Sequence, residues 1–248
     1  MIDIKRTKYR PLLYINVLCI TFIVFASVII ANPKALAVLA RHISIPTSGL
    51  MSDGTLSHYQ SFVTPDNQTI LDAAAQYSTI EDIYDQANAW LYVADPILNG
   101  ETDVWLSPED FLTSTPHYET NPVPGTVAGD CEEQANTLVS ILRAAGISAE
   151  DVRVVLGRLP NDENPAKGHV WAEILLNGGW TALDPSQGPQ WNDNLGLITL
   201  YRGKDFEYYR NHDYPVTDVI AYYNDLYFLD AENNTGNAPE TWSSRLSN

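Results

Sequence analysis

Cysteine is scarce in this chain, which has two among 248 residues. Cys19 lies in an apolar N-terminal segment and Cys131 lies in the polar remainder, so a disulfide framework is excluded. Histidine is also scarce, and no pair of histidines has the spacing of metal ligands, so we predict no metal site. A lone thiol is either a small buried side chain or a group kept for its reactivity. Both interpretations stay open for Cys131 at this point.

Positive charge is scarce beyond the N-terminal region. Residues 1–42 carry six Lys/Arg and one acidic residue, a net of +5, whereas the remainder carries eight basic and thirty acidic residues, a net of −22. Phosphate binding needs clustered cations, so we predict that the chain does not bind nucleic acid. The same charge opposes binding of the acidic part along an anionic membrane surface.

A long apolar run occurs once, from Pro11 to Ala31, and it contains no charged residue. At about 1.5 Å per residue this run can cross a hydrocarbon core of about 30 Å. Because four basic residues precede it, we predict a cytoplasmic stub over 1–10, a single transmembrane helix over 11–31 and an extracytoplasmic domain at the cell membrane. A cleaved signal peptide, processed at Ala35-Leu36-Ala37, is the alternative.

The remaining chain divides by composition. Residues 32–66 contain scattered proline, glycine and serine and predict a stalk, residues 67–230 predict the folded domain, and residues 231–248 predict a frayed polar tail. Within the domain, apolar spacing predicts helices over 69–77 and 79–94 and extended segments from residue 152 onward. Residues 101–128 are rich in proline and predict an ordered loop.

A helix is predicted to begin at Cys131. Asp130, followed three residues later by Glu133, forms the pattern of a capping box, and Gly146 is a suitable C-terminal cap. The apolar residues between them recur at helical spacing: Ala135, Leu138, Val139, Leu142 and Ala145. A thiol at a helix N-terminus is favoured in its nucleophilic thiolate form by the helix dipole. The neighbouring glutamates oppose the thiolate, so a second activating group is needed.

The turn Asn177-Gly178 predicts a β-hairpin between the extended segments 169–176 and 179–184. If the loop has two residues, paired positions sum to 355, and His169 and Asp184 lie on the same face of the sheet as diagonal neighbours. If the loop has three residues, Asp184 moves to the opposite face. The preference of Asn-Gly for a two-residue turn favours a carboxylate directed toward the imidazole.

Cys131, His169 and Asp184 together form the chemical set for thiol acyl transfer. Histidine takes the thiol proton and the carboxylate orients the imidazole. A metal site made of the same three residues is a less suitable interpretation, because their order favours catalysis.

Three ordered segments of the chain resemble the transglutaminase-like superfamily, over roughly residues 100–187, and the upstream segment also resembles the bacterial transglutaminase-like cysteine proteinases. The matching stretches are Gly129-Asp130-Cys131-Glu132-Glu133-Gln134-Ala135 with Leu142-Arg143-Ala144-Ala145-Gly146-Ile147, then Gly168-His169-Val170-Trp171-Ala172-Glu173, then Gly179-Trp180-Thr181-Ala182-Leu183-Asp184-Pro185-Ser186. The resemblance implies an α+β, papain-like fold in which the catalytic helix packs on an antiparallel sheet.

The resemblance also implies roles for particular residues. Cys131 is expected to be the nucleophile, His169 the general base and Asp184 its orienting partner, while Trp105 is a candidate oxyanion donor. Trp171 and Trp180 flank the site, either as candidates for a substrate groove or as core aromatics. The tyrosines of residues 201–227 could likewise border a groove, although packing in the core is the favoured interpretation.

These observations predict an extracytoplasmic, membrane-anchored cysteine enzyme that acts on peptide or side-chain amide bonds through a thioester. Water would release an acid, as in a peptidase or amidase, and an amine would release a cross-linked product, as in a transglutaminase. No cofactor is required, and the expected partners are a protein or peptide substrate or a cell-envelope polymer, besides the membrane. The alternative is a catalytically silent binding module tethered to the cell surface, since a fold does not by itself fix function.

Overall fold

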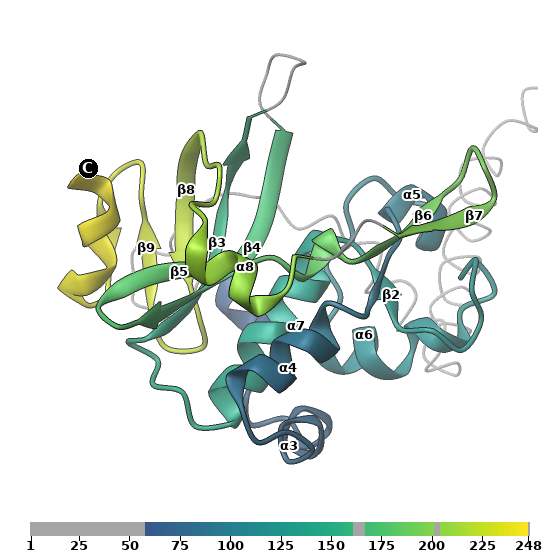
Figure 1. Ribbon diagram of the computed structural model, residues 1–248, viewed down its shortest axis with the longest axis horizontal. Coiled ribbons are helices and arrows are strands. Elements are labelled where there is room, and N and C mark those ends of the chain that lie inside the picture. The colour runs from purple at the N-terminus through teal and green to yellow at the C-terminus, as the bar shows by residue number, and fades with distance from the viewer. Residues whose placement is uncertain (1–57, 161–166, 201–203, 248) are drawn as a thin grey trace, which may run out of the picture. The chain divides into compact units, whose positions relative to one another are not determined.

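Helix α7 (Cys131–Ala144) is the element around which the chain is arranged in this computed structural model, which describes residues 58–160, 167–200 and 204–247 (Figure 1). Every residue from Glu132 to Leu142 is buried, because the helix packs against β3 and β4 as well as against α3, α4 and α6. The other helices are α3 (Gln68–Ala74), α4 (Ile80–Ala87), α5 (Asp95–Leu98), α6 (Pro108–Thr113) and α8 (Phe206–Asn211), with short 3₁₀ helices η1 (His58–Phe62), η2 (Thr115–His117), η3 (Pro185–Gln187) and η4 (Glu240–Ser247).

Both ends of α7 follow the local chemistry of the sequence. The Glu133 side chain accepts a hydrogen bond from the Asp130 backbone N–H at 3.0 Å, as a capping box requires. At the other end Gly146 has φ of 95°. There the backbone N–H of Gly146 donates to Arg143 O and that of Ile147 donates to Leu142 O, which is a Schellman motif. The predicted start and end of this helix are confirmed.

A six-stranded sheet packs against α7. Its strand order is β10-β9-β8-β3-β4-β5 and every neighbouring pair is antiparallel. The strands are β3 (Val152–Leu159), β4 (Lys167–Leu176), β5 (Gly179–Leu183), β8 (Asp218–Tyr223), β9 (Phe228–Asp230) and β10 (Thr235–Gly236). The described part of the chain is therefore an α+β fold with a helix on an antiparallel sheet, as the sequence predicted.

The hairpin between β4 and β5 has the predicted register. Leu176 pairs with Gly179 and Ala172 pairs with Leu183, and Asn177 and Gly178 both have positive φ, at 52° and 84°. Positive φ at both central residues is the geometry of a type I′ turn. Since side chains alternate along each strand, this register directs His169 and Asp184 to the same face.

A second sheet has the strand order β2-β1-β6-β7. The prediction of one helix over 79–94 is wrong in its second half, because residues 91–92 form a strand of this sheet. Its strands are β1 (Leu91–Tyr92), β2 (Ala128–Gly129), β6 (Pro189–Asn192) and β7 (Leu197–Leu200). Helix α4 ends at Ala87 because the following backbone pairs instead with β2: Leu91 N–H donates to Val127 O and Val93 N–H donates to Gly129 O. The apolar periodicity continued past the end of the helix, since Leu91 and Val93 are buried as strand residues.

The predicted loop over 101–128 contains two short helices, α6 and η2, and ends in β2. Ser107 caps α6 by accepting from Asp110 N–H, and Pro108 occupies the first helical turn. This segment therefore has more regular structure than its proline content indicated. It leads directly into the N-terminus of α7.

The predicted boundaries of the domain also need correction at both ends. Phe62 and Val63 are buried, so residues 58–66 belong to the folded domain and not to a stalk. At the other end Trp242 is 0% exposed, which places a residue of the predicted frayed tail in the main core. Among the described residues no helix has the length and apolarity needed to cross a bilayer. The predicted transmembrane segment 11–31 lies outside the described residues.

Candidate active site

Cys131 is the first residue of α7 and is partly exposed. Its thiol donates a hydrogen bond to Glu132 Oε2 at a Sγ–O distance of 3.2 Å. Burial raises the pKa of Glu132 well above its usual range, and the charges of Cys131 and Glu133 add smaller effects in the same direction. Glu132 therefore holds a proton more readily than an exposed glutamate does, which reduces the repulsion that it would exert on a thiolate.

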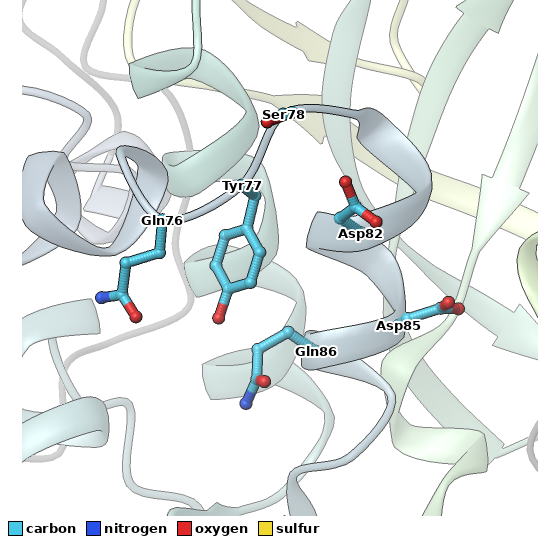
Figure 2. A pocket seen from close by; sticks show the side chains of 6 residues that line it. All are labelled: Gln76, Tyr77, Ser78, Asp82, Asp85 and Gln86. Atoms are coloured by element: carbon cyan, nitrogen blue, oxygen red, sulfur yellow. The ribbon is translucent and has the colours of Figure 1, made fainter.

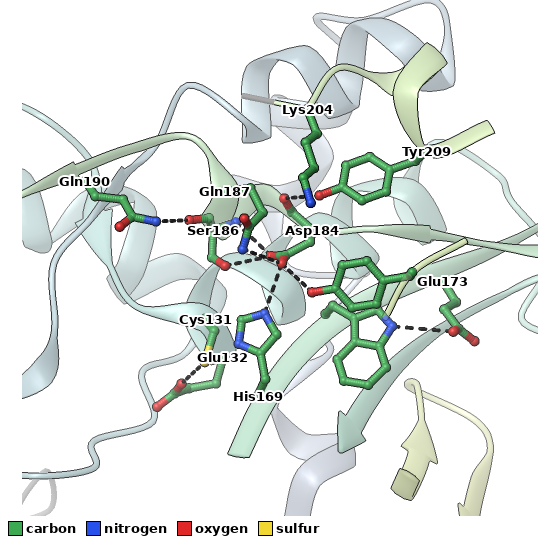
Figure 3. Close-up of polar contacts among 12 residues, drawn as sticks. Cys131, Glu132, His169, Glu173, Asp184, Ser186, Gln187, Gln190, Lys204 and Tyr209 are labelled. Carbon is green, nitrogen blue, oxygen red and sulfur yellow. Dashed lines mark hydrogen bonds and ion pairs between the residues drawn. The ribbon is translucent and has the colours of Figure 1, made fainter. Parts of the chain in front are cut away.

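His169 lies on β4 and presents its two ring nitrogens to different partners. The Nε2 atom lies 3.0 Å from Asp184 Oδ2, and the other ring nitrogen faces the Cys131 thiol (Figure 3). Because Nε2 is used by Asp184, the nitrogen left for the thiol is Nδ1. Burial lowers the pKa of His169, but the Asp184 carboxylate and the hydrogen bonds with Asp184 and Cys131 outweigh burial and raise it to about 10. The imidazole is thus protonated at neutral pH.

Asp184 follows β5, caps η3 and is 0% exposed. Its Oδ1 accepts hydrogen bonds from Ser186 N–H at 3.1 Å and from the Ser186 hydroxyl at 2.6 Å. Its Oδ2 accepts from His169 Nε2 at 3.0 Å, Gln187 Nε2 at 3.1 Å and the Tyr214 hydroxyl at 2.5 Å. Burial alone would raise the pKa of Asp184, but the charge of His169 and these donors lower it. The carboxylate is therefore ionised, as the orienting member of a triad must be.

Two further tyrosines hold the backbone of Asp184. The hydroxyl of Tyr84, on α4, donates to the Asp184 carbonyl oxygen at 3.1 Å, and that of Tyr209, on α8, does so at 3.5 Å. Both hydroxyls lie against a buried negative charge, which raises their pKa above the usual range after the larger effect of burial. The tyrosines of residues 201–227 that the structure describes are thus partly packing residues, as predicted, and partly donors around Asp184, which the sequence did not reveal.

A cavity of about 300 Å³ opens beside His169. It is lined by residues from β1, the end of β3, β4, η3 and β6: Tyr92, Leu159, Pro160, His169, Ser186, Gln187 and Gln190. Apart from His169 this lining carries no charged side chain. Gln187 and Gln190 each use their amide nitrogen on an internal acceptor, Asp184 Oδ2 and Ser186 O. Sequence reasoning missed this cavity, since its walls come from five separate segments.

The predicted aromatic candidates do not border the cavity. Trp171 is 0% exposed and its ring centroid lies 6.1 Å from that of His169, so its interpretation as a core aromatic beside the site is confirmed. Trp180 stacks on the buried guanidinium of Arg153 at 3.7 Å and donates its indole N–H to Thr241 O. Trp180 does not line the cavity beside His169, and its place in a substrate groove stays a prediction.

Trp105 lies just before Leu106, whose backbone N–H donates to Glu133 on α7. The indole N–H of Trp105 donates to Asp103 at 3.0 Å, and its ring packs against Tyr59 and Phe62. In this arrangement the N–H is already used. Its role as an oxyanion donor stays a prediction.

Five acidic side chains gather near the N-terminus of α7, where the sequence indicated only a capping box. Carboxylate oxygens lie within 4.8 Å of one another in the sets Asp95, Asp103, Glu132 and Asp95, Asp130, Glu133. Oxygen atoms so arranged are close enough to share a hard cation. Burial and neighbouring carboxylates raise the pKa of Asp95 to about 7 and that of Glu133 well above its usual range. Protons bound by these carboxylates therefore relieve the repulsion between them, as a cation would. We assign no metal ligands here.

A larger hollow of about 510 Å³ lies between α3 and α4 (Figure 2). It is lined by Gln76, Tyr77, Ser78, Asp82, Asp85 and Gln86. None of these residues pairs a nucleophile with a base. Cys131 lines neither hollow, but the smaller cavity is lined by His169, which binds Asp184, and it is therefore the candidate active site.

Comparison with known families agrees with this geometry. Residues 67–185 match the transglutaminase-like superfamily, and this segment holds Cys131, His169 and Asp184. Over this segment, which is a little under half of the chain, the protein is similar to the transglutaminase-like superfamily. No curated protein matches the chain.

Solved structures are only distantly similar to this chain. Calcium-bound LapG from Legionella pneumophila has 15% sequence identity and a TM-score of 0.42, and covers 72% of this chain and 84% of its own. EGTA-treated LapG from the same organism has 14% identity and a TM-score of 0.42, over 74% and 96%. A candidate cysteine protease from Cytophaga hutchinsonii has 20% identity and a TM-score of 0.37, over 66% and 51%. Likenesses of this size carry no argument about mechanism or substrate.

Proposed function

We propose that this protein is a cysteine acyl-transfer enzyme that cleaves peptide or side-chain amide bonds through a thioester on Cys131. The observation that carries the proposal is that the two ring nitrogens of His169 face different partners. Nε2 is bound to the buried Asp184 carboxylate at 3.0 Å, and the other nitrogen faces the thiol at the start of α7. An imidazole held in this way can take the thiol proton and deliver it to a leaving group.

The acylation step follows from these positions. The Cys131 thiolate attacks the amide carbonyl carbon, forming a C–S bond while the carbonyl electrons move to oxygen. His169, protonated at Nδ1, then donates that proton to the amide nitrogen as the C–N bond breaks. The products are a thioester on Cys131, a free amine and a neutral imidazole. Asp184 stabilises the imidazolium before the transfer and keeps the ring oriented after it.

Deacylation uses the same residues in reverse. The neutral His169 takes a proton from water or from an incoming amine, which attacks the thioester carbonyl and expels the Cys131 thiolate. Water yields an acid, as in a peptidase or amidase, and an amine yields a new amide, as in a transglutaminase. We propose that the acceptor enters through the cavity beside His169, so access of water or amine to that cavity would decide the outcome.

The proposed setting is the outer face of a membrane. The apolar segment 11–31, with basic residues before it, would anchor the chain and expose the acidic domain outside the cytoplasm. Proteins, peptides or cell-envelope polymers bearing amide bonds would be the substrates, and no cofactor takes part in the steps above. A catalytically silent, tethered binding module is the rival function. It requires no activated thiol.

The two functions differ in the reactivity of Cys131. We would measure alkylation by iodoacetamide across pH on the full-length protein with Cys19→Ser, which leaves Cys131 as the single thiol. The enzyme should react well below the ordinary thiol pKa of about 8.5, and His169→Ala should abolish this reactivity. His212→Ala, which removes an exposed histidine stacked on Tyr208, is the matched control and should behave as the parent. An inert thiol, or one that titrates ordinarily in all variants, would favour the binding module.

A further inference from the structure

Tyr214 lies beyond residue 185, where the match to the superfamily ends, yet it contacts the centre of the site. Its hydroxyl donates to Asp184 Oδ2 at 2.5 Å. Its ring packs at a tilt on Trp171, with centroids 5.2 Å apart, and Trp171 in turn lies parallel to His169. Tyr214 therefore contacts the Asp184–His169 pair in two ways, through its hydroxyl on the carboxylate and through its ring on the indole behind the imidazole.

The two oxygens of Asp184 have different surroundings. Oδ1 is held by the backbone and hydroxyl of Ser186, only two residues further along the chain, so it is fixed locally. Oδ2 is the atom that His169 uses, and its other two donors, Gln187 and Tyr214, compete with the imidazole for the same lone pairs and charge. In a buried site each such donor takes a measurable part of the carboxylate charge.

The other titratable groups that the structure describes near His169 and Asp184 do not donate a hydrogen bond to the Asp184 carboxylate. Cys131 on α7 faces the opposite nitrogen of His169. Tyr84 on α4 and Tyr209 on α8 donate to the backbone oxygen of Asp184 and not to its carboxylate. The ammonium of Lys204 lies over the ring of Tyr208, 5.0 Å from its centroid. Among the described residues, Tyr214 is the phenol that reaches the carboxylate.

We propose that Tyr214 is a positioning residue of the active site, which moderates the negative charge that Asp184 presents to His169 and so keeps the imidazolium a usable acid. This inference rests on the proposed function. Without the hydroxyl, Ser186 and Gln187 still hold the carboxylate in place, but more of its charge is directed at His169. The imidazolium then holds its proton more tightly and protonates the leaving amine more slowly.

The test is the pH dependence of Cys131 alkylation by iodoacetate in the full-length protein with Cys19→Ser. This anionic reagent reacts fastest while His169 is positively charged, so the decline of the rate at high pH reports loss of the imidazolium proton. For Tyr214→Phe we expect this decline to move to higher pH by about half a unit, which corresponds to about 0.7 kcal/mol, because more of the Asp184 charge then acts on the imidazolium.

Tyr209→Phe is the matched control. It removes a buried hydroxyl from the same cluster that contacts the backbone of Asp184, so a merely structural effect would appear in both variants. The inference is supported if only Tyr214→Phe moves the decline upward. It is overturned if the two variants share the parent profile, or if Tyr214→Phe moves the decline downward, which would mean that the hydroxyl only holds the carboxylate near His169.

A second variant covers the case in which Tyr214→Phe does not fold. Gln187→Met removes the other competing donor on Oδ2 and should shift the decline in the same direction. An unchanged profile in that variant would overturn the idea that donors on Oδ2 share the charge. Failure of the proposed function itself is distinguishable, because it would appear in the parent protein as a thiol with ordinary titration and no dependence on His169.

Discussion

The indole of Trp171 lies parallel to the imidazole of His169, with ring centroids 6.1 Å apart and planes 18° from each other. The two residues are on the same face of β4, two positions apart, and Trp171 is 0% exposed. Opposite His169 on β3 is Gly157, where an added Cβ would meet the Asp218 backbone oxygen at 2.7 Å and the Trp171 ring at 2.8 Å. The absence of a side chain on Gly157 thus allows the indole to lie against the strand and support the imidazole ring.

Replacing Trp171 should therefore affect stability and reactivity together. We expect Trp171→Ala to lower the free energy of unfolding by about 3–5 kcal/mol. It should also move Cys131 alkylation toward the ordinary thiol pH range, because the imidazole loses its support. Trp180→Ala is the control, since its ring packs on Arg153 and not on His169. Denaturant unfolding and iodoacetamide kinetics measure the two effects. Equal alkylation profiles in the two variants would contradict the supporting role.

The paired pKa shifts of His169 and Asp184 predict a pH window for stability. The pKa of His169 is raised from 6.5 to about 10, so its stabilising contribution is fully present below pH 6.5 and is lost as the pH rises through 10. The pKa of Asp184 is lowered, so its contribution is present above pH 3.8 and is lost as the pH falls through its folded value. The ion pair should stabilise the fold most between these two limits, at about pH 4–6.5.

This window can be measured by comparing the parent protein with His169→Gln in denaturant unfolding at a series of pH values. The difference in free energy of unfolding should fall between pH 6.5 and 10, with a slope approaching about 1.4 kcal/mol per pH unit. His212→Gln, at an exposed site, should show no such slope. A difference that stays constant across this range would mean that His169 is not paired as an imidazolium.

The buried pair of Arg153 and Glu173 makes a separate prediction about the core. Both side chains are 0% exposed, their closest charged atoms are 2.8 Å apart, and the guanidinium lies between the rings of Trp180 and Tyr222 at 3.7 Å from each. Arg153→Met leaves the Glu173 charge buried without its cation, and we expect a loss of about 3–5 kcal/mol.

The double variant Arg153→Met with Glu173→Gln should recover part of that loss, because it leaves no buried charge. Thermal and denaturant unfolding of the two single variants and the double variant form a complete cycle. Strictly additive losses would show that the two side chains are not energetically coupled. Alkylation of Cys131 should change little in any of them.

Local sequence chemistry was enough to predict the parts of the site that are set within a few residues. The capping box at Asp130 fixed the start of α7, and the Asn177-Gly178 turn fixed the register that directs His169 toward Asp184. Both are short-range effects, because caps and two-residue turns depend on adjacent backbone geometry. The positions of Cys131, His169 and Asp184 therefore followed from spacing and alternation, whereas their proposed roles also rest on the resemblance to the superfamily.

The surroundings of that set could not be predicted in the same way. Tyr214 meets Asp184 from 30 residues away, and Asp95 meets Glu133 across 38 residues, so no periodic pattern connects them. The end of α4 was missed for a related reason, since Leu91 is apolar whether it continues a helix or joins a strand. Strand pairing with β2 decided between the two, and such pairing depends on the whole fold.

Trp242 makes the last prediction, in a segment that composition had indicated was a frayed tail. The residue is 0% exposed, its carbonyl oxygen accepts from Arg153 Nη1 at 2.9 Å and its indole N–H donates to Glu150 O at 3.0 Å. Deleting residues 239–248 removes these contacts and uncovers the buried guanidinium. We expect a loss of about 3–5 kcal/mol, seen as a fall in Tm of about 10 °C.

Deletion of residues 244–248 is the matched control for that truncation, because it shortens the chain but keeps Trp242 and its contacts. Its Tm should stay close to that of the parent. Trp242→Phe should fall between the two, since it keeps an aromatic ring and the backbone carbonyl bound to Arg153 but loses the indole donor. If the longer deletion had the same Tm as the parent, the C-terminal segment would not be part of the core. Other residues would then have to cover Arg153.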